Sequence, residues 1–266
     1  MKFKSILLYS LLILALFLYS CESNDGLIVK GNPDSKDTNK VLVELFTNFK
    51  CVPCVQANNL LDGINKKLGI TNNDTSVIII RIHTNLFTGD PYYNFNIPAN
   101  NSRIQYYNAG ISNPKGFLMG TNMGNIDAAV WTNKINERLG IQNTFEIRSE
   151  LEFFDTLRNG ELHIYVKKLS GSSLQDYVMH IAVVENGLIM NPPAPNGESD
   201  FENTLRDFIT PIGGEPVSIS AGQTLFFKEY FTLKDGIEPD ETYFIIFVQS
   251  LSTKEVFGVV KQKLIL

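Results

Sequence analysis

Cysteine, histidine and tryptophan are rare in this chain of 266 residues, which contains three, three and one of them respectively. Three cysteines are too few for a small scaffold held together by several disulfides. A structural zinc site takes four nitrogen or sulfur ligands, so we expect no metal and no cofactor. Basic residues are outnumbered, since 23 Lys and Arg stand against 28 Asp and Glu. That acidic balance gives no electrostatic footprint for a nucleic-acid partner.

No apolar run reaches the length of about 20 residues that crosses a bilayer. Ile6 to Tyr19 are mostly apolar and uncharged, and two lysines precede them, which predicts a signal peptide over residues 1–20. The run ends in Leu-Tyr-Ser-Cys, which resembles the lipobox of bacterial lipoproteins. The resemblance implies that Cys21 is acylated and holds the chain on a membrane surface without spanning it. An ordinary cleaved signal without lipid is the alternative.

The rest of the chain divides into three parts that differ in composition and in hydrophobic periodicity. Residues 21–40 are polar and predict a flexible tether. Between residues 41 and 141, strand patterns alternate with helical ones, which predicts an α/β domain with a largely parallel sheet and helices on its faces. The expected strands are Val41–Phe46, Ser76–His83 and Gly116–Gly120, and the last expected helix is Ile126–Gly140.

Residues 142–266 contain six or seven strand-like runs separated by Gly, Ser, Asn or Asp turns, and helical periodicity is nearly absent. This pattern predicts a second domain, an antiparallel, all-β, immunoglobulin-like sandwich. One expected connection, residues 191–216, is unusually long, and a loop of that length is more often functional or mobile than inert.

The chemistry of the chain centres on a Cys-Val-Pro-Cys element between an expected strand and an amphipathic helix. Cys51 is expected just before the helix and Cys54 in its first turn. Backbone N–H groups and the helix dipole favour negative charge there and lower a thiol pKa from about 8.5. The thiolate is the attacking species in disulfide exchange. The pattern therefore predicts Cys51 as a nucleophile open to solvent and Cys54 as the resolving thiol.

Two segments resemble the signatures of the thioredoxin superfamily. VELFTNFKCVPCVQANNLL is similar to the active-site segment, and YNAGISNPKGFLMG is similar to the second signature. The resemblance implies a thioredoxin-like fold for the first domain and a cis-proline at Pro114. It also implies that Asn113 and Pro114 lie at the position where an extended peptide substrate pairs. A plain trans-proline before a strand is the alternative.

The chain departs from that family at the residues that move protons. Leu45 stands where the family carries a buried acid. Glu44 is the nearest acid and is expected on the other face of its strand. His83, at the end of an expected strand, is the substitute candidate for a proton relay, because an imidazole titrates near neutral pH. A hydrogen bond that caps a loop is the alternative role for His83.

Five segments that cover both expected domains resemble the outer-membrane lipoproteins of the twenty-eight-kilodalton Omp class. They are VELFTNFKCVPC, IHTNLFTGDPYYN, ISNPKGF, NTLRDFITPIGGEPV and FVQSLSTKEVFGVVKQKL. The resemblance implies a thioredoxin-like domain joined to a C-terminal β-sandwich. It also implies a lipid-anchored place at the outer membrane or cell surface, with a periplasm-facing orientation left open.

Two functions follow from these patterns. The first is a lipid-anchored thiol–disulfide oxidoreductase of the cell envelope, whose partners are extracytoplasmic proteins bearing thiols or disulfides. The second is a non-catalytic binding or adhesion lipoprotein in which Cys51 and Cys54 form a silent disulfide. Burial of the Cys51 sulfur would favour the second. The direction of exchange, the client proteins, the electron donor and the oligomeric state stay open.

Overall fold

The computed structural model describes residues 27–30, 39–67, 76–171 and 176–265. The expected signal peptide over residues 1–20 and the expected lipid site at Cys21 lie outside the described residues. Within them, the helices are α2 (Val52–Lys67), α3 (Pro91–Phe95), α4 (Ile97–Tyr107), α5 (Ala128–Leu139) and the short η1 (Asp155–Leu157) and η2 (Pro239–Glu241). None of the described helices is long and apolar enough to cross a membrane.

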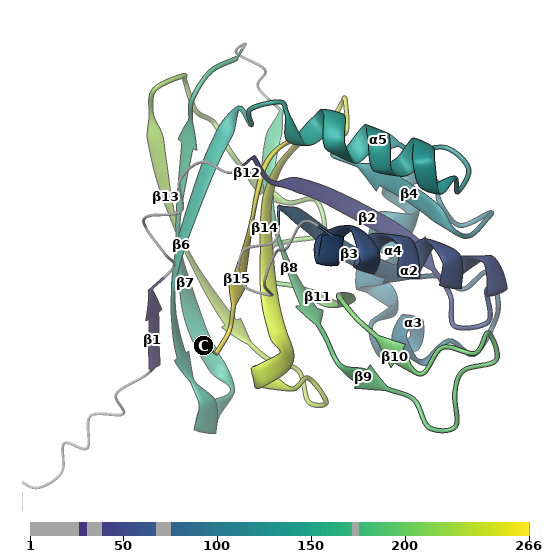
Figure 1. Cartoon of the computed structure of the whole chain (residues 1–266). Coiled ribbons are helices and arrows are strands. Elements are labelled where there is room, and N and C mark those ends of the chain that lie inside the picture. Colours follow the sequence, from purple (N-terminus) through teal and green to yellow (C-terminus); the bar gives the residue numbers. More distant parts are fainter. Residues whose placement is uncertain (1–26, 31–38, 68–75, 172–175, 266) are drawn as a thin grey trace, which may run out of the picture.

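The described strands form two large sheets and one two-stranded ribbon (Figure 1). The first sheet has nine strands: β15 (Val256–Lys263), β14 (Thr242–Ser250), β8 (Tyr177–Glu185), β11 (Thr204–Phe208), β3 (Val77–His83), β2 (Val41–Thr47), β4 (Lys115–Leu118) and β5 (Thr121–Asn122) in that spatial order, with β12 (Glu215–Pro216) beside β8. The second has four strands: β1 (Leu27–Lys30), β6 (Phe145–Phe154), β7 (Asn159–Lys168) and β13 (Thr224–Thr232). The ribbon pairs β9 (Leu188–Ile189) with β10 (Asp200–Phe201).

The predicted fold class, a thioredoxin-like α/β domain followed by a separate immunoglobulin-like sandwich, is wrong. One mixed, nine-stranded sheet runs through both halves of the chain. Strand β11 makes the junction, because it pairs in parallel with β3 through Thr204 and Arg81 and antiparallel with β8 on its other side. This strand lies inside the expected loop 191–216, where its short Thr-Leu-Arg-Asp-Phe sequence gives no strand pattern.

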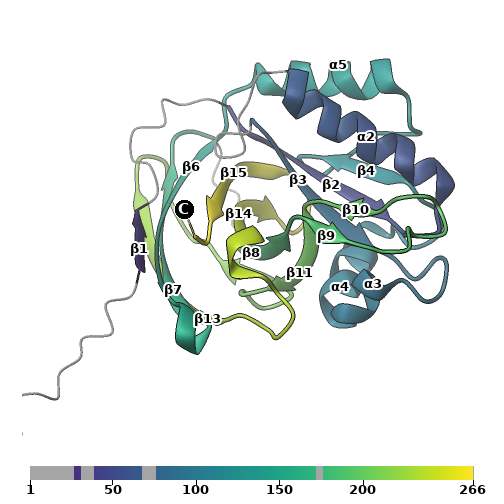
Figure 2. The same ribbon diagram turned by 60° about the horizontal axis from the view of Figure 1, so that its bottom comes forward.

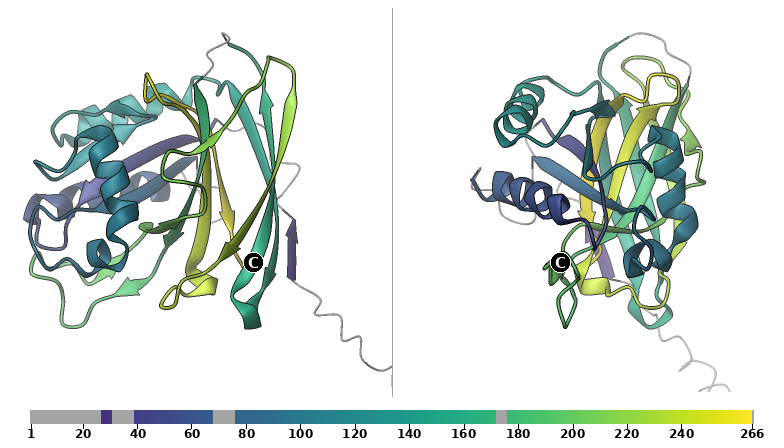
Figure 3. Two further views of the ribbon diagram at one scale, coloured as in Figure 1. Left: turned by 180° about the vertical axis from the view of Figure 1, so that it is seen from behind. Right: turned by 90° about the vertical axis from the view of Figure 1, so that its right-hand side faces the viewer.

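The part of this sheet that comes from the first half is covered on both faces. Helices α2 and α5 lie on one face, and α3 and α4 lie on the other (Figure 3). Every residue of β2 and β3 is buried, as expected for strands that helices cover on both sides. Strand β2 pairs in parallel with β3 but antiparallel with β4, so the sheet is mixed rather than largely parallel.

Strand β14 lies between two hydrophobic cores and contributes side chains to both. Because successive side chains of a strand point to opposite faces, Ile245 and Phe247 join the core under the helices, whereas Phe244 and Ile246 join the core against the four-stranded sheet. Figure 2 shows that second sheet lying across β8, β14 and β15. The continuous apolar run of β14 is therefore explained by burial on both sides.

Strand β1 falls within the segment 21–40 that was expected to be a flexible tether. Its four residues pair antiparallel with β6, from Leu27 opposite Phe153 to Lys30 opposite Glu150. The start of the described chain thus forms one edge of the four-stranded sheet.

Candidate functional site

The Cys-Val-Pro-Cys element lies where α2 begins, as predicted from its pattern. Cys51 and Cys54 are joined by a disulfide, with their Cα atoms 5.3 Å apart. The Cys51 N–H donates to the Asn48 carbonyl at 2.9 Å, and the Cys54 N–H donates to the Cys51 carbonyl at 3.1 Å. Pro53 occupies the first turn of the helix, where its missing N–H has no partner to lose.

The disulfide is closed to solvent although the peptide between its cysteines is not. Cys51 is 2% exposed and Cys54 is 0% exposed, whereas Val52 is 66% exposed. The expectation that Cys51 is open to solvent is therefore wrong for this disulfide-bonded form. An incoming thiolate needs a path to one of the two sulfur atoms, and both cysteines are buried here.

A segment from the second half of the chain lies against this turn. We call residues 190–199, which connect β9 to β10, the strap. The Asn196 N–H donates to the Phe49 carbonyl at 3.3 Å, and the Asn196 side-chain amide donates to the Cys51 carbonyl at 3.5 Å. Ala194 is buried beside Tyr92, in a small apolar cluster that Phe49 joins. The strap thus contacts the backbone that leads into the disulfide.

A chain of hydrogen bonds fastens the strap to α2 and β3. The Glu198 carboxylate accepts from the side-chain amides of Asn58 at 2.6 Å and of Asn196 at 2.6 Å. The Asn58 oxygen in turn accepts from Arg81 Nε at 3.0 Å, and Arg81 forms an ion pair with Asp62 at 2.7 Å. We call the contact between Glu198 and Asn58 the latch. The two latch residues lie 140 positions apart in the sequence.

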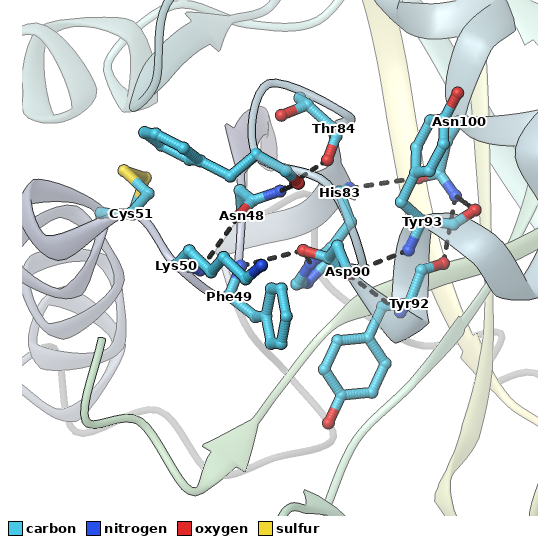
Figure 4. Close-up of polar contacts among 12 residues, drawn as sticks. Asn48, Phe49, Lys50, Cys51, His83, Thr84, Asp90, Tyr92, Tyr93 and Asn100 are labelled. Atoms are coloured by element: carbon cyan, nitrogen blue, oxygen red, sulfur yellow. Dashed lines mark hydrogen bonds and ion pairs between the residues drawn. A yellow bond between two sulfur atoms is a disulfide. The ribbon is translucent and has the colours of Figure 1, made fainter. Parts of the chain in front are cut away.

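Asp90 contacts the turn that leads to Cys51, through the Phe49 N–H (Figure 4). One carboxylate oxygen accepts from the Tyr92 and Tyr93 N–H groups and caps α3, and the other accepts from the Phe49 N–H at 2.9 Å and bonds His83 Nδ1 at 2.8 Å. Burial raises the pKa of Asp90, but His83 and the backbone N–H groups lower it by more, so the net shift of this pKa is downward. The carboxylate is therefore held ionised.

His83, the predicted candidate for a proton relay, lies beside Asp90. Its ring is 1% exposed, packs edge-on against Tyr92 at 4.8 Å and lies 6.0 Å from the ring of Phe201. Within the described part of the chain, its Nε2 atom has no hydrogen-bond partner. The structure brings His83 together with Asp90, which fits the loop-capping alternative.

Glu44, the second candidate relay, lies on the opposite face of the sheet. Its two carboxylate oxygens accept from Arg103 Nε at 2.7 Å and Arg103 Nη2 at 2.8 Å, and Tyr107 donates its hydroxyl at 2.6 Å. Burial lowers the pKa of Arg103, but Glu44, Tyr107 and Tyr106 together raise it by more, so the net direction is upward. Glu44 is thus committed to a buried ion pair under α4, on the face away from α2.

The Asn113–Pro114 peptide bond is cis, as predicted. Asn113 donates its side-chain amide to the Thr84 hydroxyl at 2.6 Å. Asn48 donates to the Thr84 carbonyl at 2.7 Å, and the Asn48 carbonyl accepts from Cys51. The structure therefore connects Asn113 to the cysteine turn through Thr84 and Asn48. Figure 4 shows Thr84, Asn48 and Cys51.

The roles of Asp90, Asn196 and the latch were not predicted from the sequence. Asp90 stands directly before Pro91 at the start of a helix, and an Asp followed by Pro at the first helical position is a recognised start signal that could have found it. The Asn196-Gly197 pair is a turn signal, but nothing local says where that turn docks. In the described residues, no group of three or more His, Cys, Asp or Glu side chains is placed to hold a metal ion.

Neither a protein-family model nor a curated protein matches this chain. Among solved structures, HBP35 of Porphyromonas gingivalis matches with a TM-score of 0.72 over 85% of this chain and 76% of its own, at 16% sequence identity. This chain shares its fold with HBP35. A domain of the outer membrane lipoprotein Omp28 from the same organism matches with a TM-score of 0.33 over 46% of this chain and 89% of its own, at 18% identity. Identity with HBP35 is too low to carry an activity across with the fold.

Proposed function

We propose that this protein is a thiol–disulfide exchange protein of the cell envelope and that Cys51 and Cys54 are its redox couple. The observation that carries the proposal is the position of the disulfide at the first turn of α2. After reduction, the Cys51 sulfur would lie at a helix N-terminus, where the thiolate is stabilised. Exchange then runs through a mixed disulfide between Cys51 and a partner protein, which Cys54 resolves.

The short span of the disulfide supports this role over a structural one. Its cysteines are three positions apart, and in the chain-entropy account closing so short a loop stabilises a fold by roughly 2 kcal/mol, less than the roughly 3 kcal/mol of a 15-residue loop. A structural disulfide would stabilise the fold more if it joined cysteines that lie far apart in the sequence. The partners we propose are extracytoplasmic proteins with thiols or disulfides, and the proposed anchor is lipid on Cys21 at the outer membrane or cell surface.

The reduction potential tests the proposal. Equilibrating the protein in dithiothreitol buffers and counting alkylated cysteines by mass gives the potential of the Cys51–Cys54 couple. We expect a value between about −270 and −120 mV, the range of exchange proteins. A value below about −300 mV is typical of structural disulfides and would overturn the redox role.

A trapping variant tests the same role with client proteins. Cys54→Ser leaves Cys51 without its resolving partner, so mixed disulfides should accumulate in an envelope extract and disappear on reduction. The matched control is the double variant Cys51→Ser/Cys54→Ser, which should trap nothing. Equal recovery from both variants would contradict exchange through Cys51.

The burial of both sulfur atoms favours a second candidate function. In that case the protein is a non-catalytic envelope binding protein and the disulfide is silent. The 2% exposure of Cys51 is the observation that supports it. The two functions separate in the potential measurement, since a silent disulfide should resist reduction across the whole range of the exchange proteins.

A further inference from the structure

The strap holds a position that a partner peptide would need. Asn196 occupies the carbonyl oxygens of Phe49 and Cys51 with its own main-chain and side-chain N–H groups. These are the backbone acceptors of the first cysteine and of the residue two positions before it. An extended polypeptide that approached the disulfide would meet the same acceptors, so the strap and such a peptide compete for one surface.

Polar contacts hold most of the strap in place, and only Ala194 and the partly buried Met190 pack in the small apolar cluster. Of its ten residues, all within the described part of the chain, Ala194 alone is buried. Ile189, the residue just before the strap, is 70% exposed. Phe201, just beyond its other end, is 3% exposed and anchors that end in the apolar cluster. A segment with few buried apolar contacts opens at a lower free energy than the core.

The latch is the firmest of these polar contacts. Glu198 gathers Asn58 and Asn196 on its two oxygens, and its N–H donates to the Asn196 side-chain oxygen at 3.0 Å. Hydrogen bonds to a charged group are stronger than neutral ones. Removing the Glu198 carboxylate therefore frees the strap at the point where it contacts both α2 and the cysteine turn.

We propose that the strap is a built-in occupant of the peptide-docking surface at Phe49–Cys51, and that release of the latch opens the disulfide to extended partner chains. The proposal rests on the redox function proposed above and adds its regulation. In the closed form the strap fills the surface and keeps the disulfide oxidised and unreactive. In the open form the same surface receives a partner segment through main-chain hydrogen bonds.

The rate of disulfide reduction tests this directly. Dithiothreitol in excess reduces the Cys51–Cys54 disulfide and becomes its own cyclic disulfide, and alkylation at timed intervals gives the rate. Glu198→Ala should be reduced about tenfold faster than the unaltered protein, because a charged hydrogen-bond centre no longer opposes opening. Glu137→Ala, which removes an exposed carboxylate on α5, is the matched control and should leave the rate unchanged.

Two further measurements keep the result interpretable. Thermal unfolding followed by circular dichroism should show Glu198→Ala still folded at the assay temperature. Should it unfold, Asn196→Ala replaces it, because that variant removes the side-chain contacts of Asn196 to Cys51 and Glu198 and leaves the Glu198–Asn58 contact in place. An unchanged reduction rate in a folded variant would overturn the strap proposal. A potential below about −300 mV with a faster rate in Glu198→Ala would instead retain the strap and reject the redox function.

Discussion

The carboxylate of Asp90 and the imidazole of His83 meet at 2.8 Å with both side chains buried. The same carboxylate caps α3 and accepts from the Phe49 N–H. One side chain therefore ties the end of β3, the start of α3 and the turn that leads to the disulfide into a single unit. Its removal should affect stability more than the loss of an ordinary helix cap.

Asp90→Ala should lower the free energy of unfolding by about 2–4 kcal/mol, because a helix cap and charged hydrogen bonds are lost together. Urea titration measures this change. Asp127→Ala is the matched control, since Asp127 caps α5 through the Val130 N–H but is exposed, and it should cost only about 1 kcal/mol. Equal losses in the two variants would show that the buried contacts of Asp90 add nothing.

The same carboxylate predicts a pH dependence with a definite sign. Burial raises the pKa of Asp90, but His83 and the backbone donors lower it by more, so the folded pKa lies below its ordinary value of 3.8. The stability from this group is present above the unfolded pKa of about 3.9 and is lost as pH falls through the lower folded pKa. Asp90→Asn should flatten the decline of the unfolding free energy as pH falls below about 4, and an unchanged slope would contradict the shift.

The ion pair between Glu44 and Arg103 gives a prediction for the face under α4. Arg103→Ala leaves a buried carboxylate without its cation, so we expect a loss of about 3–5 kcal/mol in urea titration. The control is Arg148→Ala, because Arg148 pairs with Glu146 at 3.1 Å while its side chain is 53% exposed. That exposed pair should be worth no more than about 1 kcal/mol, and a comparable loss in both variants would count against the buried pair.

Local features of the site could be predicted from the sequence, whereas its long-range contacts could not. The Cys-x-x-Cys pair at a helix start is a property of a few neighbouring residues, and the cis bond before Pro114 was implied by the resemblance of a short segment to the thioredoxin superfamily. The latch joins residues 140 positions apart, and neither Asn58 nor Glu198 has a local signal for the other. Solvent closure over Cys51 depends on the whole surrounding fold, so the sequence predicted the opposite.

The fold class failed for a related reason at β11. Two of the five residues of β11 are charged, so its pattern predicts a loop instead of a strand. Arg206 is accommodated because its guanidinium lies 3.5 Å from the Phe95 ring centroid and pairs with Glu185. Those partners come from other segments, and without them the strand that joins the two halves cannot be recognised.

The shared sheet predicts cooperative unfolding of both halves of the chain. Phe247 packs in the core under the helices and Phe244 in the core against the four-stranded sheet, although both belong to β14. Phe247→Ala and Phe244→Ala should each cost about 3–5 kcal/mol, and each should shift unfolding of the two cores together. Phe226→Ala, at a side chain that is 55% exposed, should change stability by less than about 0.5 kcal/mol.

Two probes follow the two cores separately. Fluorescence of Trp131, the single tryptophan of the sequence, reports the core under the helices. Hydrogen exchange of peptides from β6 and β7, read by mass spectrometry, reports the core against the four-stranded sheet. Coincident transitions in urea are expected, because β14 cannot leave one core while remaining packed in the other. Two separate transitions, with each Phe variant shifting only one of them, would show that the halves unfold as independent domains despite their common sheet.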